Sequence, residues 1–163
     1  MVDKSNKDAT INSLNKVCRS QDMVHVNIDG QLARKQLIQN ISELLLENFC
    51  PRLRRNVYVH VDIVSRCDNE AGGYCWGNKD EVFIEIPRNS GEHRYTRQEM
   101  LINLTHELIH AKQFILGELS STTSSWKKEN HSCTPYSKQP WEREAYYWEE
   151  RLYKKYFERL DIL

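Results

Sequence analysis

Residues 96–117 decide the fold, and they read TRQEMLINLTHELIHAKQFILG. Thr96 and Glu99 match a capping box at a helix N-terminus, and Gly117 suits the position just past a helix C-terminus. Between them, apolar residues recur every three or four positions, which is the rhythm of an amphipathic helix. The apolar positions are Met100, Leu101, Leu104, Leu108, Ala111, Ile115 and Leu116. We therefore expect one long helix with a buried face.

This helix pattern contains the motif His106-Glu107-Leu108-Ile109-His110. Residues four apart lie on the same helix face, so both imidazoles can bind one zinc ion. Glu107 would lie beside them and activate a water molecule as a general base. Both histidines fall next to the apolar stripe, which predicts a half-buried cleft. The alternative is a surface helix that carries two solvated histidines.

A catalytic zinc site needs a third protein ligand, and three residues are candidates. Glu142 and Glu144 belong to a second helix pattern that opens at Pro140. Its apolar face comprises Trp141, Ala145, Trp148, Leu152 and Tyr156. The two glutamates lie at opposite margins of that face, so periodicity does not choose between them, and either could serve only the helix dipole. His131, in the polar stretch before this helix, is the third candidate.

The motif and the later segment together resemble the gluzincin zinc metallopeptidases, in which a helix beginning Glu-x-x-Ala follows the two histidines. This resemblance implies that the third ligand is Glu142, with Ala145 as the small residue of the pattern. The family's Asp or Asn that supports a ligand histidine would fall on Tyr146, which is a departure. Residues 96–153 are also similar to small metallopeptidase-like proteins of bacteria and phages.

Other zinc peptidase families fit less closely. SprT-like proteases share the motif but take a third histidine, which here could only be His131, and their zinc-ribbon cysteine pairs are absent from this sequence. The similarity to ImmA/IrrE-like proteases is also more distant. The metzincin pattern needs a glycine and a histidine where this chain has Gln113 and Leu116.

The composition fits one domain. The chain has 163 residues, with 23 Lys and Arg against 23 Asp and Glu, which is enough for a single core. We expect a polar, flexible segment at residues 1–20 and one metallopeptidase domain at residues 21–163. The balanced charge makes nucleic acid an unlikely partner, so a DNA-linked role rests only on the SprT-like resemblance. The sequence has no signal-peptide or membrane-spanning pattern, so we expect a cytoplasmic protein that does not bind membranes.

The cysteines are odd in number and lack C-x-x-C spacing, which argues against a disulfide framework. Cys67 and Cys75 flank a Gly-Gly turn, and we expect two reduced thiols near each other there. A second metal site that uses Cys67, Cys75 and Cys133, or a pairing among them, stays open.

The remaining patterns predict an α+β fold. We expect a weak strand at residues 23–28 and a helix at residues 31–48 that Asp29 caps and Pro51 ends. Alternation of β-branched and polar residues predicts further strands at residues 56–64, 73–76 and 81–87.

These elements resemble a reduced zincin-like core. In it, a small three-stranded antiparallel or mixed sheet packs on the N-terminal helix, the motif helix and the C-terminal helix. The same resemblance implies that the strand at residues 82–86 lines the cleft and pairs with an extended peptide at its free edge. The irregular stretch at residues 119–139 would be either a lid or a connector.

The expected function is hydrolysis of peptide bonds in a peptide or protein substrate, with Zn²⁺ as cofactor and Glu107 as general base. Lys112 and Gln113 fall on exposed phases of the helix, so we expect them to be solvated. By position alone, the candidates for stabilising the oxyanion are Tyr136, His131, Tyr146 and Tyr147. The alternatives are a non-catalytic binding module on a zincin scaffold, with a structural or absent metal, and a metal-dependent hydrolase of another bond.

Overall fold

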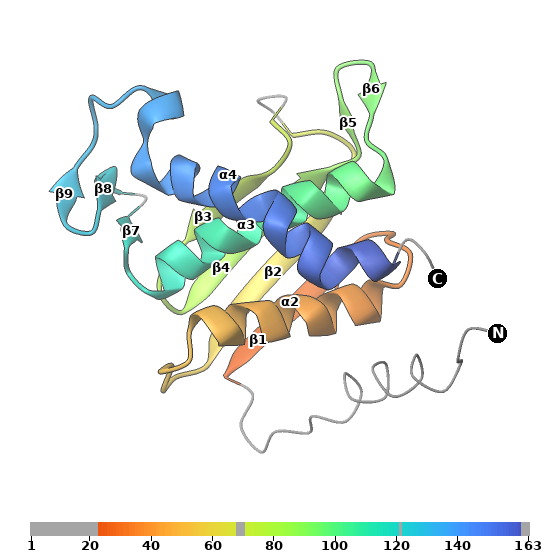
Figure 1. Ribbon diagram of the computed structural model, residues 1–163, viewed down its shortest axis with the longest axis horizontal. Coiled ribbons are helices and arrows are strands. Elements are labelled where there is room, and N and C mark those ends of the chain that lie inside the picture. The colour runs from red at the N-terminus through yellow and green to blue at the C-terminus, as the bar shows by residue number, and fades with distance from the viewer. Residues whose placement is uncertain (1–22, 68–70, 121, 161–163) are drawn as a thin grey trace.

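A four-stranded mixed sheet forms the base of the fold (Figure 1). The computed structural model describes residues 23–67, 71–120 and 122–160, so the predicted flexible segment at residues 1–20 lies outside the described residues. The strand order is β1-β2-β4-β3. Strands β1, β2 and β4 are parallel, and β3 is antiparallel to β4. The strand bounds are β1 Val24–Asp29, β2 Val57–Val64, β3 Tyr74–Gly77 and β4 Glu81–Pro87.

The α+β class is confirmed, but the predicted three-stranded sheet is wrong by one strand. The weakly alternating residues that follow Met23 form β1, which pairs in parallel with β2. The predicted free edge at residues 82–86 is also wrong, because β4 is paired on both sides, with β2 and with β3. Strand β3 is therefore the edge strand on that side of the sheet.

Helices α2 and α3 cover one face of this sheet, and α4 packs against α3 on the same side (Figure 1). Their bounds are α2 Lys35–Phe49, α3 Arg97–Ile115 and α4 Pro140–Leu152. Alternate strand residues point toward them and form the core, because side chains on a strand alternate between faces. The buried strand residues are Val24, Val26, Ile28, Val57, Val59, Val61, Val82, Ile84 and Ile86.

The opposite face of the sheet carries polar and aromatic side chains. The rings of His60, Phe83 and Trp76 stack across three strands, with centroid distances of 5.1 and 5.6 Å. Two residues further along β2, on the same face, Asp62 is in register with Asp29 of β1 on one side and with Glu85 of β4 on the other. We call this surface the outward face.

The local signals at the ends of α3 are confirmed. The Thr96 hydroxyl accepts a hydrogen bond from the Glu99 amide at 3.2 Å, and the Glu99 carboxylate accepts one from the Thr96 amide at 2.7 Å. These two bonds form the predicted capping box. Gly117 ends the helix with a φ of 69°, a left-handed conformation that suits glycine.

The predicted start of α2 was wrong. Asp29 is the last residue of β1 instead of a helix cap, and α2 begins only at Lys35, without a side-chain cap at Arg34. Asp29 is therefore paired within the sheet, whereas the sequence pattern had assigned it to the start of the helix. The end of α2 was predicted correctly, since it stops at Phe49, just before Pro51.

The stretch predicted as irregular contains a small three-stranded sheet, made of β7 Leu119–Ser120, β8 Ser125–Trp126 and β9 Glu129–Asn130. We call residues 119–130 the β7–β9 segment. Trp126 anchors it, because this side chain is buried with its ring centroid 6.4 Å from that of Trp141.

The remaining elements are short. A hairpin of β5 Asn89–Ser90 and β6 His93–Arg94 precedes α3, a 3-10 turn at Tyr136–Lys138 precedes α4, and a π turn at Tyr153–Phe157 and a 3-10 turn at Glu158–Leu160 follow it. None of the helices in the described ranges has both the length and the apolar content that crossing a bilayer requires.

Candidate metal centre

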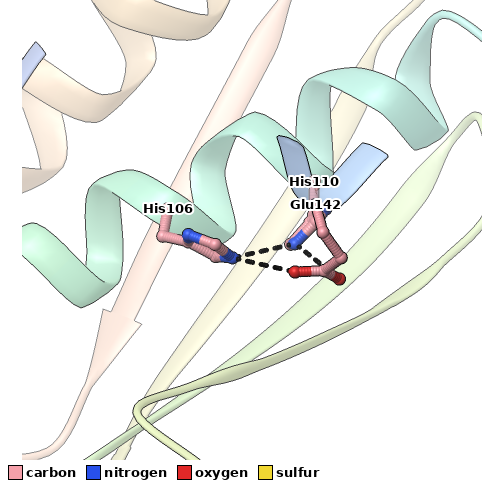
Figure 2. A group of neighbouring side chains, drawn as sticks. All are labelled: His106, His110 and Glu142. Atoms are coloured by element: carbon pink, nitrogen blue, oxygen red, sulfur yellow. Dashed lines mark hydrogen bonds and ion pairs between the residues drawn. The ribbon is translucent and has the colours of Figure 1, made fainter. Parts of the chain in front are cut away.

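Helices α3 and α4 bring three potential metal ligands together (Figure 2). His106 and His110 come from consecutive turns of α3, and Glu142 comes from the first turn of α4. The two Nε2 atoms lie 3.1 Å apart, and each lies 3.5 Å from a carboxylate oxygen of Glu142. One ligand atom from each residue lies within 4.8 Å of the others. The three side chains therefore converge on one point.

The packing of the two helices explains this convergence. Ala145 is fully buried, and this small residue lets α4 approach α3 closely. Pro140 begins α4, and Glu142 follows in the first turn, where the helix dipole favours a negative charge. His106, His110 and Glu142 are only 9, 6 and 6% exposed.

The other ring nitrogen of each histidine also has a partner. His106 Nδ1 lies 2.7 Å from Glu149 Oε2, and His110 Nδ1 lies 2.8 Å from Gln113 Oε1. In the gluzincin resemblance, the position of the histidine-supporting Asp or Asn is occupied by Tyr146, whose ring packs edge-on against His106 at 4.8 Å. The supporting carboxylate comes from Glu149 on the next turn of α4.

The donor set fits a divalent cation. If Glu149 and Gln113 accept the protons on the two Nδ1 atoms, both Nε2 lone pairs face the Glu142 carboxylate. Such a group of acceptors needs a cation at its centre. Two imidazoles and one carboxylate are ligands that zinc uses in proteins.

A proton is the cation that this group can hold without a metal. Burial disfavours the charged imidazolium, but hydrogen bonds to Glu142 and Glu149 outweigh it and raise the pKa of His106 to about 9. Burial also disfavours the carboxylate of Glu142, yet its contacts with the two histidines hold its pKa well below the usual range. A metal that enters the site must therefore displace a proton.

Glu107 lies beside this group and against the start of β3. It is 6% exposed, and burial raises its pKa while the two histidines oppose the rise. A Cβ atom added at Gly73 would lie 2.6 Å from Glu107 Oε1. The absence of a side chain at Gly73 thus makes room for the carboxylate.

The other two candidate ligands lie elsewhere. Glu144 forms an ion pair with Lys112 at 2.9 Å and is not part of the converging group. His131 Nδ1 lies 3.3 Å from the Thr134 hydroxyl, and its ring packs edge-on against Trp141 at 5.8 Å.

The prediction that Lys112 and Gln113 are solvated was wrong, because they are only 7 and 0% exposed. Both side chains reach α4: Lys112 through Glu144, and Gln113 through Glu144 and the carbonyl group of Trp141. The periodicity of α3 alone could not reveal that a second helix packs on this side.

Two of the candidate oxyanion-stabilising residues lie at the site. The Tyr136 hydroxyl donates a hydrogen bond to Glu142 Oε2 at 2.7 Å, and Tyr146 packs on His106. Tyr147 instead contacts Trp148, and the Arg151 guanidinium lies 4.0 Å from its ring centroid.

The cysteines form no second centre in the part of the chain that the structure describes. Cys50, Cys67, Cys75 and Cys133 form no disulfide with one another, and the group on α3 and α4 is the only set of potential ligands found among the described residues. Cys75 lies near the candidate site: burial, and then the charge of Glu107, raise the pKa of its thiol.

Sequence reasoning missed Glu149, Gln113 and Gly73. A signal existed for the first two. Glu149 lies two helical turns after Glu142, and Gln113 lies one turn after His110, so each shares a helix face with a ligand candidate.

Comparison with protein-family models, with curated proteins and with solved structures gave no match to this chain. The gluzincin resemblance therefore stays a prediction that rests on the motif residues.

Proposed function

We propose that this protein is a zinc-dependent metallopeptidase that hydrolyses peptide bonds in a peptide or protein substrate. The observation that supports this proposal is the convergence of His106, His110 and Glu142 beside the buried carboxylate of Glu107. A chance motif on a surface helix would not need a carboxylate from a second helix, nor partners for both Nδ1 atoms.

A zinc ion held by the three ligands would polarise the scissile carbonyl and lower the pKa of a bound water. Glu107 would accept a proton from the attacking water and then deliver it to the leaving amine. The raised pKa of Glu107 suits this role, since a general base works best with a pKa near the working pH. Tyr136 would donate a hydrogen bond from its hydroxyl to the developing oxyanion after leaving Glu142.

The edge strand β3 is where an extended substrate would bind. Its outer side pairs with no other described strand, and Gly73, just before the strand, contacts Glu107. A peptide that adds to this edge as a further strand would pass next to the general base. These observations support β3 as the substrate strand in this proposal, instead of β4, which the resemblance implied.

The test combines zinc analysis with two substitutions. Protein purified without a His-tag should contain about one zinc per molecule, and His106→Ala should remove it. Glu107→Gln should keep the zinc and lower hydrolysis of denatured proteins by a factor of about 10² to 10⁴.

Each contrary result has a separate meaning. A wild-type protein without zinc would overturn the proposal. Zinc without hydrolysis of any denatured protein would favour a binding module or a hydrolase of another bond. Full activity of Glu107→Gln would exclude Glu107 as the base.

A further inference from the structure

Glu144 was a candidate metal ligand by sequence, but its carboxylate binds Lys112 and Gln113 instead. These two residues follow His110, the second histidine of the motif, by two and three positions. Its carboxylate accepts hydrogen bonds from the Lys112 ammonium at 2.9 and 3.2 Å and from Gln113 Nε2 at 2.9 Å. These contacts connect α4 to the part of α3 that is C-terminal to His110.

The contacts of Gln113 fix the orientation of its amide. Nε2 lies 3.0 Å from the carbonyl oxygen of Trp141 and 2.9 Å from Glu144 Oε2. A carbonyl and an ionised carboxylate can only accept, so both protons of the amide nitrogen are engaged there. A flipped amide would place its oxygen against two acceptors, and the residue is fully buried, so water cannot replace the lost bonds.

The fixed amide determines where His110 carries its proton. Gln113 Oε1 can only accept, and it lies 2.8 Å from His110 Nδ1. The neutral imidazole must therefore be protonated at Nδ1, which leaves the Nε2 lone pair directed at His106 and Glu142. This tautomer is the one that can bind a metal through Nε2.

Lys112 holds the Glu144 carboxylate next to Gln113. The Lys112 side chain is 9% exposed, and its ammonium bridges Glu144 on α4 to Glu118, which lies at 2.7 Å. Because Glu118 immediately precedes β7, the bridge also ties the β7–β9 segment to α4.

We propose that Glu144, Lys112 and Gln113 act as a positioning unit that fixes the proton of His110 on Nδ1 and turns its Nε2 toward the metal site. The use of that lone pair by a metal rests on the proposed function, whereas the proton position itself does not.

Nitrogen NMR of metal-free protein labelled in the imidazole rings tests the unit directly. The wild type should show His110 as the Nδ1-protonated tautomer at neutral pH. Gln113→Leu removes the acceptor and should shift His110 toward a mixture of tautomers. Glu144→Gln, a nearly isosteric change, should do the same to a smaller extent, and it carries the test if Gln113→Leu does not fold.

The double variant Gln113→Glu/Glu144→Gln should restore the tautomer. It moves the carboxylate to position 113, where it accepts from His110, and it supplies an amide donor at position 144. It loses the hydrogen bond to the Trp141 carbonyl group, so we expect it to be less stable than the wild type. A role limited to packing would not be rescued by this exchange. Glu150→Gln is the control, because Glu150 lies on the same helix in an exposed ion pair with Lys154.

Zinc affinity, measured by competition with a chelator, gives the second readout. Gln113→Leu should weaken binding by a factor of about 10 to 100, and the double variant should recover most of that loss. A folded Gln113→Leu or Glu144→Gln protein with an unchanged His110 tautomer would overturn the proposal. If the tautomer shifts but no variant or wild type binds zinc, the metallopeptidase proposal fails while the positioning unit stands.

Discussion

Two helix contacts on the same side of the sheet differ sharply in chemistry. The contact of α2 with the sheet is apolar and is built from Ile38, Ile41, Leu45 and Leu46. Its one buried polar residue, Ser42, only donates a hydrogen bond to the carbonyl group of Ile38 in its own helix. The contact of α3 with α4 instead buries histidines, glutamates, a lysine and a glutamine.

The comparison suggests that one helix contact serves the stability of the fold and the other serves the chemistry of the candidate site. Burial of apolar area stabilises the fold wherever it occurs. Buried polar and charged groups cost free energy unless each has a partner. In the α3–α4 contact almost every such group has one, including both nitrogens of each histidine. We infer that this contact is arranged for function and that α2 supplies the stability that it lacks.

The largest expected effect separates the two glutamates of α4. Glu142→Ala should reduce zinc from about one per molecule to below roughly a tenth, because it removes a ligand that faces both histidines. Glu144→Ala should keep the metal at saturating zinc and weaken its binding by about tenfold. Elemental analysis after gel filtration measures both, and full zinc retention by Glu142→Ala would shift the assignment of the third ligand to His131.

The next effect concerns the apolar contact alone. Leu45→Ala in α2 should lower the free energy of unfolding by about 3 kcal/mol, because Leu45 is fully buried and the change leaves a cavity. Zinc affinity per folded molecule should stay unchanged. Urea unfolding and chelator competition measure the two quantities, with Leu116→Ala, an exposed leucine, as the control. A loss of zinc affinity in folded Leu45→Ala would contradict the inference that the apolar α2 contact and the metal centre are independent.

A smaller effect is expected where the sheet contacts Glu107. Gly73→Ala adds a methyl group that would collide with this carboxylate, so the side chain or β3 must shift. We expect kcat to fall by about 10²-fold with zinc content unchanged. Gly91→Ala is the control for backbone strain away from the site, since nothing lies within 4 Å of a Cβ added there but its φ of 56° disfavours alanine. Equal activity of Gly73→Ala and the wild type would show that this contact does not position Glu107.

The smallest effect is a pH dependence of the metal-free protein. The pKa of His106 rises from an ordinary value of 6.5 to about 9 in the folded state. The stability from its charged form is therefore fully present below pH 6.5 and is lost as the pH rises through about 9. We expect a loss on the order of 2 kcal/mol in urea unfolding with a chelator present, and none in His106→Ala. A flat profile between these pH values would contradict the proton-holding role of His106.

The sequence predicted what local patterns control. The capping box at Thr96, the end of α3 at Gly117 and the strands around Val59 and Ile84 depend on neighbouring residues, and all are present in the structure. The convergence of His106 and His110 on one helix face followed from their spacing for the same reason.

What the sequence pattern left open or predicted wrongly depends on contacts between elements that are distant in the chain. Glu142 and Glu144 lie within one turn of α4, and only the crossing of α4 over α3 distinguishes them. The burial of Lys112 and Gln113 has the same cause. The parallel pairing of β1 with β2 decided that Asp29 is a strand residue, although a helix cap was equally consistent with its sequence.

The outward face has a consequence for self-association. Asp29, Asp62 and Glu85 stand side by side on adjacent strands, and no strand of the four-stranded sheet contributes a lysine or arginine to that face. Like charges in register weaken the sheet slightly, but they also repel an identical face that carries the same row. Two copies that approach through their stacked aromatic rings would bring six carboxylates together, so this row acts at neutral pH as a barrier against sheet-to-sheet aggregation.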